Sequence, residues 1–205
     1  MNFIVGILAA AKGLALLTGL IVLNTSTASV SPTAVTVDGG FVRITCVVED
    51  AYPRELEDLA RTGTDIPLYV VVAIHGDDRD EPLGESTSRS RLVYDMVEQV
   101  YRVEFGVGGQ GRVYGTLDSA IAASSTFERI ALVPIGRIDS TSTYVVTVQA
   151  VLGKTSVEAL ENNRIDLMYY WNYKRPVART QPIEGRALLG LHRPVETNRP
   201  DNIPR

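Results

Sequence analysis

The residues best suited to chemistry are three carboxylates, Asp95, Glu98 and Glu104, which lie close in the sequence to two tyrosines. Two carboxylates can serve as general acid and general base, so this group suggests a hydrolase. Neighbouring residues of a β-strand point to opposite faces, and this segment alternates as strands do. Asp95 is therefore expected to face away from Tyr94, and Glu104 away from Tyr101. We interpret the carboxylates as solvent-side charges, so no catalytic residue is predicted and a carboxylate-dependent hydrolase is the least favoured hypothesis.

A second set of carboxylates, Asp77, Asp78, Asp80 and Glu81, lies in one acidic loop. Carboxylate oxygens are calcium ligands, but these residues do not follow the alternate-residue spacing of a calcium-binding loop. Arg79 also lies among them. A solvated loop is the favoured interpretation, and the sequence leaves calcium binding open.

Histidine and cysteine are too few for most metal centres and nucleophile systems. His75 and His192 are the only histidines, and Cys46 is the only cysteine. This excludes a multi-histidine metal centre, a thiolate cluster and an intramolecular disulfide, and it argues against a Ser/His or Cys/His nucleophile. Cys46 is expected to be a small buried side chain on a strand. The sequence therefore predicts neither a metal nor a cofactor.

The segment from Gly106 to Gly111 has the spacing G-x-G-x-x-G directly after a predicted strand. In a dinucleotide-binding fold, a helix begins at the third glycine and the preceding strand is buried on both faces. Here residues 112–115 intervene, and the preceding strand alternates between apolar and polar residues. The segment is predicted to be a loop.

The charge balance argues against nucleic acid as a partner. The chain has 205 residues with 20 Lys and Arg against 24 Asp and Glu, which gives a net charge of −4. A nucleic-acid binder usually carries a basic excess, so none is expected here. The length suits one domain with terminal extensions.

The hydrophobic pattern predicts one β-rich domain over residues 41–174. Alternating or continuous apolar runs predict strands at residues 41–49, 66–74, 144–152 and 165–173, a hairpin at 91–105 that turns at Glu98 and Gln99, and an edge strand or irregular segment at 127–138. Short helices are predicted at residues 53–63 and 117–124, the second capped by Thr116. The predicted fold is mainly β (α+β), an antiparallel two-layer β-sandwich-like domain of about seven strands and two short helices.

The amino terminus carries an apolar run from Gly13 to Leu23, preceded by Lys12 and followed by small polar residues. This pattern is typical of a signal peptide, and a segment of about 20 residues can alternatively span a bilayer as an anchor. Residues 1–28 are therefore interpreted as a signal peptide or an amino-terminal membrane anchor, and residues 29–40 as a polar linker. Either alternative predicts an exported protein, in the periplasm or on the outer face of the cytoplasmic membrane.

The last predicted strand is unusually aromatic. Tyr169, Trp171 and Tyr173 share one face of it, where they either close the core or form a ligand or partner surface.

The segment that follows, residues 175–205, is basic and rich in proline, and it is predicted to be a disordered tail. Leu188, Leu189 and Leu191 form its apolar patch and are candidates for docking a partner. This tail and the amino-terminal segment are the two candidates for membrane contact.

Several motifs occur in a recognisable order along the chain. They are Leu56-Glu-Asp-Leu-Ala-Arg-Thr-Gly63, the hairpin Leu92-Val-Tyr-Asp-Met-Val-Glu-Gln-Val-Tyr-Arg-Val, Thr116-Leu-Asp-Ser-Ala, the strand that begins at Tyr144, and a tryptophan-bearing terminal strand. Over residues 40–175 this order resembles the bacterial family called domain of unknown function 4390, and the hairpin is its most specific part. The resemblance implies an exported bacterial protein with no assigned catalytic residues, and some members are encoded beside membrane histidine kinases.

We therefore expect a non-enzymatic extracytoplasmic binding or signalling-accessory module. Its partner would be an unknown protein or envelope component, such as a membrane sensor kinase. The alternative is a structural or assembly factor of the cell envelope, which the basic tail motivates.

Overall fold

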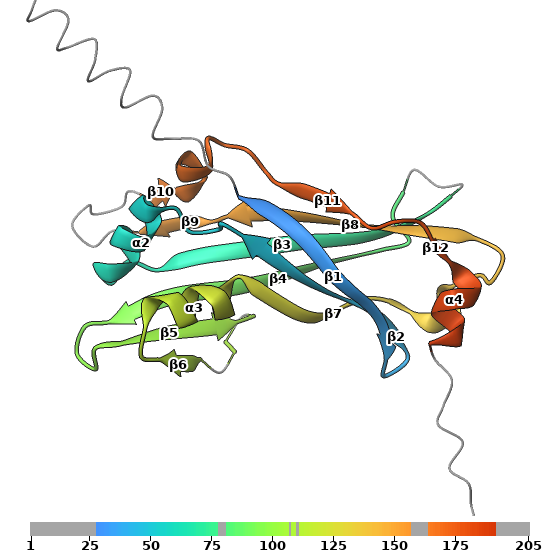
Figure 1. Ribbon diagram of the computed structural model, residues 1–205, viewed down its shortest axis with the longest axis horizontal. Helices are drawn as coiled ribbons and strands as arrows, with labels where there is room; N and C mark the ends of the chain where they lie inside the picture. The colour runs from blue at the N-terminus through green and yellow to red at the C-terminus, as the bar shows by residue number, and fades with distance from the viewer. Residues whose placement is uncertain (1–27, 78–80, 107, 110, 157–163, 192–205) are drawn as a thin grey trace, which may run out of the picture.

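The computed structural model describes residues 28–77, 81–106, 108–109, 111–156 and 164–191. Within these residues the chain forms antiparallel β-sheets with three short α-helices, which confirms the predicted mainly-β class (Figure 1). No helix of the described part is both long and apolar enough to cross a membrane.

The larger sheet has the order β11-β8-β3-β4-β5-β6, and every neighbouring pair is antiparallel. Its strands are β3 (Ile66–Gly76), β4 (Gly84–Asp95), β5 (Val100–Phe105), β6 (Arg112–Tyr114), β8 (Thr143–Leu152) and β11 (Val177–Arg179), and the short β12 (Ile183–Glu184) also pairs with β8. β3 lies between β4 and β8, as its unbroken apolar run predicts. β4 begins seven residues before the predicted hairpin because its first half is polar and gives no strand signal.

The smaller sheet has the order β1-β2-β7 and crosses the larger sheet (Figure 1). Its strands are β1 (Ser29–Asp38), β2 (Phe41–Glu49) and β7 (Thr126–Pro134), and β7 leads into a short 3₁₀ turn, η1 (Ile135–Arg137). Alternate side chains of β2, including Ile44 and Cys46, are fully buried in the common core. Burial also raises the pKa of the Cys46 thiol to about 11, which agrees with the predicted inert, buried cysteine.

The prediction of a linker at residues 29–40 is wrong for most of its length, because β1 pairs with β2 from Ser29 to Asp38. Gly39 and Gly40 both have positive φ angles, 57° and 79°, which suits the tight two-residue turn of a hairpin. The strand was missed because it lies at a sheet edge, where half-buried serines and exposed threonines interrupt the apolar alternation.

Both predicted helices are present, as α2 (Arg54–Arg61) and α3 (Leu117–Ser124). Thr116 caps α3 by accepting a hydrogen bond from the backbone N–H of Ser119 at 3.3 Å. A third helix, α4 (Gly185–Gly190), lies in the segment predicted to be disordered.

The predicted strand at residues 165–173 is wrong. Only β10 (Arg164–Asp166) is extended, and it pairs with β9 (Lys154–Ser156). The carboxylate of Asp166 then accepts a hydrogen bond from the backbone N–H of Met168 at 3.0 Å and starts a 3₁₀ helix, η2 (Leu167–Trp171). The residues alternate in polarity as a strand does. The aspartate cap nevertheless favours a helical turn, because its hydrogen bond to the backbone competes with strand pairing.

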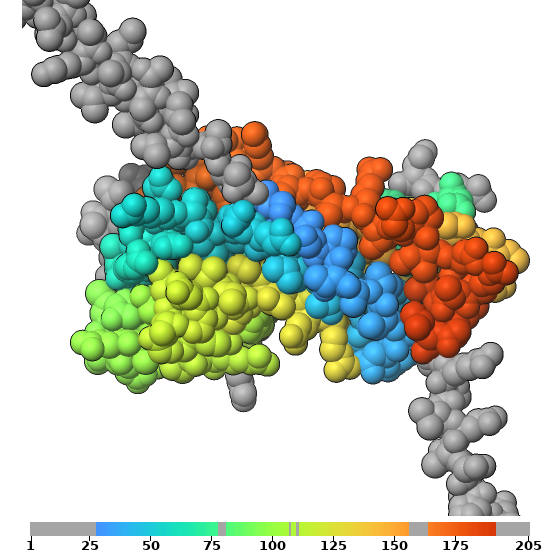
Figure 2. All heavy atoms as spheres, viewed as in Figure 1, coloured from blue at the N-terminus to red at the C-terminus, as the bar shows by residue number. Residues whose placement is uncertain are grey.

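The prediction of a disordered tail from residue 175 is also wrong as far as residue 191. β11 and β12 add to the outer edge of β8, and α4 packs Leu188 into the core with 1% of its surface exposed. On the face shown in Figure 2, this segment lies alongside β1. Backbone pairing with β8 supplies the hydrogen bonds that the tail cannot make alone. Residues 192–205 lie outside the described part.

Candidate binding groove

The three aromatic residues predicted to share a surface do not do so. Trp171 is fully buried, and its indole N–H donates a hydrogen bond of 3.0 Å to the carbonyl oxygen of Ala51. Tyr169 and Tyr173 are 55% and 64% exposed. The tryptophan therefore closes the core, whereas the two tyrosines face solvent.

The predicted leucine patch is also divided. Leu188 is buried, Leu189 is partly buried against the core, and Leu191 is 56% exposed. In a helical turn these residues point in different directions, so together they do not offer one docking surface.

The carboxylates of the hairpin stabilise its turn. Asp95 accepts hydrogen bonds of 3.0 Å from the backbone N–H groups of Val97 and Glu98. Arg102 forms ion pairs with both Asp95 and Glu98. The hydrogen bond from the Glu98 backbone, followed by that from Val97 and the contact with Arg102, lowers the pKa of Asp95 despite some desolvation.

Glu104 lies on β5 and pairs with Arg91 at 3.4 Å. Each of the three carboxylates of this hairpin thus has an arginine partner. In the acidic loop, Asp77 accepts a hydrogen bond from the backbone N–H of Thr143 at 3.1 Å, and residues 78–80 lie outside the described part. The described residues contain no group of three or more potential metal ligands.

The glycine motif joins β5 to β6, where Val103 pairs with Arg112 in an antiparallel register. A strand, β6, rather than a helix follows the motif, which is not the arrangement of a dinucleotide-binding turn, and the described residues of the motif belong to neither a helix nor a strand.

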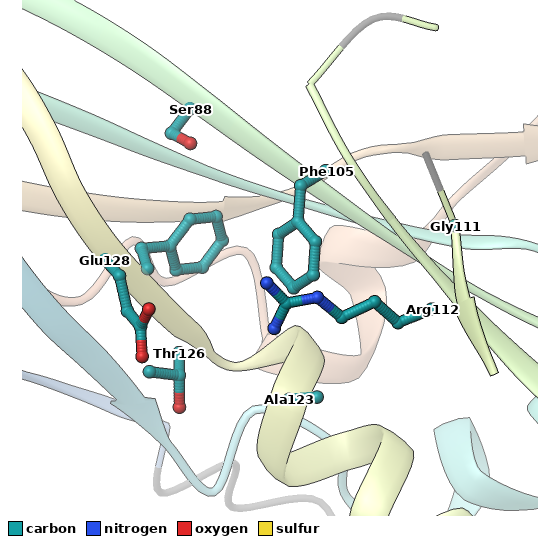
Figure 3. Close-up of a pocket in the computed structure, with 8 residues that line it drawn as sticks. Ser88, Phe105, Gly111, Arg112, Ala123, Thr126 and Glu128 are labelled. Carbon is teal, nitrogen blue, oxygen red and sulfur yellow. The ribbon is translucent and has the colours of Figure 1, made fainter. Parts of the chain in front are cut away.

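An open groove of about 610 Å³ lies where the two sheets meet (Figure 3). One wall comes from β4, β5 and β6, and the other from the end of α3 and the start of β7. The residues that line it are Ser88, Phe105, Gly111, Arg112, Ala123, Thr126, Phe127 and Glu128.

Small polar residues on β4 make room for this groove. Ser88, Ser90 and Leu92 share the inward face of the strand, and only Leu92 carries a large side chain there. The buried hydroxyl of Ser90 donates a hydrogen bond of 2.6 Å to the carbonyl oxygen of Ser124, the last residue of α3. This bond fixes the helix end against β4 beside the groove.

The central feature of the groove is the Arg112 side chain, which lies across the ring of Phe105. The guanidinium carbon is 5.8 Å from the ring centroid, within cation–π range. Figure 3 shows the guanidinium directed toward the wall that carries Thr126 and Glu128. Among the described residues Arg112 has no ion-pair partner within 4.0 Å, so its donors are available to a ligand.

A guanidinium that is stacked on an aromatic ring, as here, is suited to binding a carboxylate group of a ligand. A guanidinium binds a carboxylate through two parallel hydrogen bonds, and stacking on Phe105 limits the conformations that Arg112 must give up on binding. Glu128 on the facing wall can accept hydrogen bonds from amide or ammonium groups. Sequence reasoning missed the groove, although the serines alternating with other residues along β4 were a visible signal.

Replacement of Ser90 by alanine is expected to lower the free energy of unfolding by about 1–3 kcal/mol, because the carbonyl of Ser124 loses its partner inside the protein. Ser88→Ala on the same face is the control, and it should change the free energy of unfolding by less than about 0.5 kcal/mol. Denaturant unfolding followed by circular dichroism measures both. Equal stability of the two variants would show that the bond does not fix α3.

The family model for the domain of unknown function DUF4390 matches residues 25–159. The match covers both sheets up to β9, whereas η2, β11, β12 and α4 lie beyond it. A search of curated proteins and a search of solved structures each gave no match. Because the family model spans more than half of the 205 residues, the chain belongs to the family of the domain of unknown function DUF4390.

Proposed function

We propose that this protein is a non-enzymatic binding module that acts outside the cytoplasm, and that its groove holds a carboxylate-bearing peptide segment of a partner protein. The observation that carries the proposal is the guanidinium of Arg112, which is stacked on Phe105 and has no carboxylate partner in the described part of the chain.

The size and charge of the groove support a peptide ligand. Its volume of about 610 Å³ is within the usual range for binding sites and can hold a few side chains. A carboxylate of the ligand would lie against Arg112, while backbone N–H groups of the same segment face Glu128. A peptide offers both groups within a short distance.

A location outside the cytoplasm is supported by the sequence of the amino terminus. Lys12 precedes an apolar run, and small residues follow it, as in segments that direct export. The likeness to exported proteins encoded beside membrane histidine kinases makes the extracytoplasmic part of such a kinase our first candidate partner.

The proposal is tested by recovering partners from solubilised membranes with the full chain and with Arg112→Gln. Loss of the charge-assisted hydrogen bonds is expected to weaken binding about tenfold or more. Arg54→Gln is the matched control, because Arg54 is exposed on α2 away from the groove. A partner that binds wild type and both variants equally would contradict a role for the groove.

A further inference from the structure

An exposed aromatic and basic surface follows η2. It consists of Tyr169, Tyr173, Lys174 and Arg175, here called the aromatic–basic patch, and all four side chains are exposed. The ring of Tyr169 also packs edge-on against Tyr170, with 5.6 Å between their centroids. Among the described residues, neither Lys174 nor Arg175 has a carboxylate partner, so both charges face solvent.

The backbone holds Tyr173 outward in an unusual conformation. Asn172 and Tyr173 have φ angles of 51° and 58°, in the left-handed region. Asparagine enters this region comparatively often, whereas a bulky residue such as tyrosine rarely does. The backbone N–H of Tyr173 donates to the carbonyl oxygen of Met168 at 2.8 Å, and that of Asn172 donates to Tyr169 at 3.0 Å. With Trp171 buried as an anchor, these bonds maintain a conformation that leaves the ring of Tyr173 in solvent. Strained backbone of this kind is common at functional positions.

The patch lies beside the point where the described chain begins. Trp171 is bonded to Ala51, which follows β2, and Ser29 at the start of β1 pairs with Glu49 at the end of β2. Figure 1 shows the start of β1 next to the helical turn that follows β10. The apolar amino-terminal run ends at Leu23, and a fully extended chain from there to Ala28 spans at most roughly 18 Å.

We propose that the amino-terminal apolar segment is retained as a membrane anchor and that the aromatic–basic patch rests on the phospholipid headgroups of the same bilayer. The short connection brings this end of the domain to the membrane surface. Tyrosine is enriched at membrane–water interfaces, and lysine and arginine are attracted to anionic headgroups. Two acidic side chains at this end of the domain take part in hydrogen bonds within it, since Asp166 caps η2 and Glu49 accepts hydrogen bonds from Ser29 and Ser31. This orientation does not depend on what the groove binds.

The test uses the full chain reconstituted in vesicles of phosphatidylcholine with phosphatidylglycerol. A nitroxide label at Tyr173→Cys reports depth through its accessibility to oxygen and to a water-soluble nickel complex. The native Cys46 is fully buried, so it is shielded from the labelling reagent, and burial also raises the pKa of its thiol to about 11. The control label is Leu191→Cys, which is 56% exposed directly after α4, and Figure 1 shows α4 at the opposite end of the domain from η2.

We expect the accessibility of the label at residue 173 to oxygen and to the nickel complex to be that of the membrane–water interface. The label at residue 191 should have the accessibility of a site in water. The double variant Lys174→Glu with Arg175→Glu should shift the label at residue 173 toward water in anionic vesicles. Arg137→Glu with Arg186→Glu changes the net charge equally at the far end and should not shift it. Aqueous accessibility at both labels, or a chain isolated from membranes without its first 27 residues, would overturn the proposal.

Discussion

Replacement of Trp171 by alanine is expected to lower the free energy of unfolding by about 3–5 kcal/mol. The side chain is the largest of those that are fully buried, and no part of it reaches solvent. Its removal leaves a cavity in the core and also leaves the carbonyl oxygen of Ala51 without its 3.0 Å hydrogen bond. Both effects act on one contact between η2 and the segment that connects β2 to α2.

Guanidinium unfolding followed by far-ultraviolet circular dichroism measures this effect, because Trp171 is the only tryptophan and the alanine variant loses its fluorescence probe. Trp171→Phe separates the two contributions. It keeps most of the apolar contact but not the hydrogen bond, so a loss of about 1–3 kcal/mol is expected. An alanine variant that unfolds at the same denaturant concentration as wild type would refute the assignment of Trp171 to the core.

Deletion of residues 177–205 is expected to lower the free energy of unfolding by an amount similar to or larger than that for Trp171→Ala. It removes β11, β12 and α4, and with them the side chain of Leu188, whose loss alone corresponds to about 2–5 kcal/mol. It also exposes the outer edge of β8, a strand in which every second side chain is buried. An unpaired apolar edge of this kind promotes aggregation, so we expect a less soluble product that unfolds at lower denaturant concentration.

Deletion of residues 192–205 is the control for this experiment. It spares α4, and the free energy of unfolding should change by less than about 0.5 kcal/mol. The fluorescence of Trp171 reports unfolding in both truncated chains. If the longer deletion were as stable as the shorter one, residues 177–191 would not be part of the folded domain. The shorter deletion also tests the envelope-assembly hypothesis, because it removes only the part of the basic tail that lies outside the described structure.

The elements that were predicted correctly are those whose signals are local. The cap at Thr116 and the apolar spacing of the next turn define α3, and the continuous apolar run of β3 predicts its central position. The hairpin of β4 and β5 pairs Leu92 with Val103 and Tyr94 with Tyr101, as alternation predicts. Neighbouring residues fix these features, so they can be read from a short window of sequence.

The errors concern segments whose structure depends on distant partners. η2 alternates like a strand, but Trp171 is held by Ala51, 120 residues earlier in the chain. β11 and β12 are only three and two residues long, too short to give a strand signal of their own, and they are ordered by pairing with the edge of β8. Free energy from contacts between distant parts of the chain outweighs a weak local preference in each case.

By itself, the sequence determined the mainly-β class, the central strand, two helices, the buried cysteine and the resemblance to a family that the family model then confirmed. Only the tertiary structure decided where a ligand can bind. Phe105 and Arg112 are neighbours in one hairpin, but Thr126 and Glu128 face them only because the second sheet packs across the first. The groove is a product of that packing, since its side chains come from segments that meet only in the folded protein. The aromatic–basic patch comes from one short segment, and there the tertiary structure decided which ring is buried, because Trp171 bonds to Ala51 whereas Tyr169 and Tyr173 remain exposed.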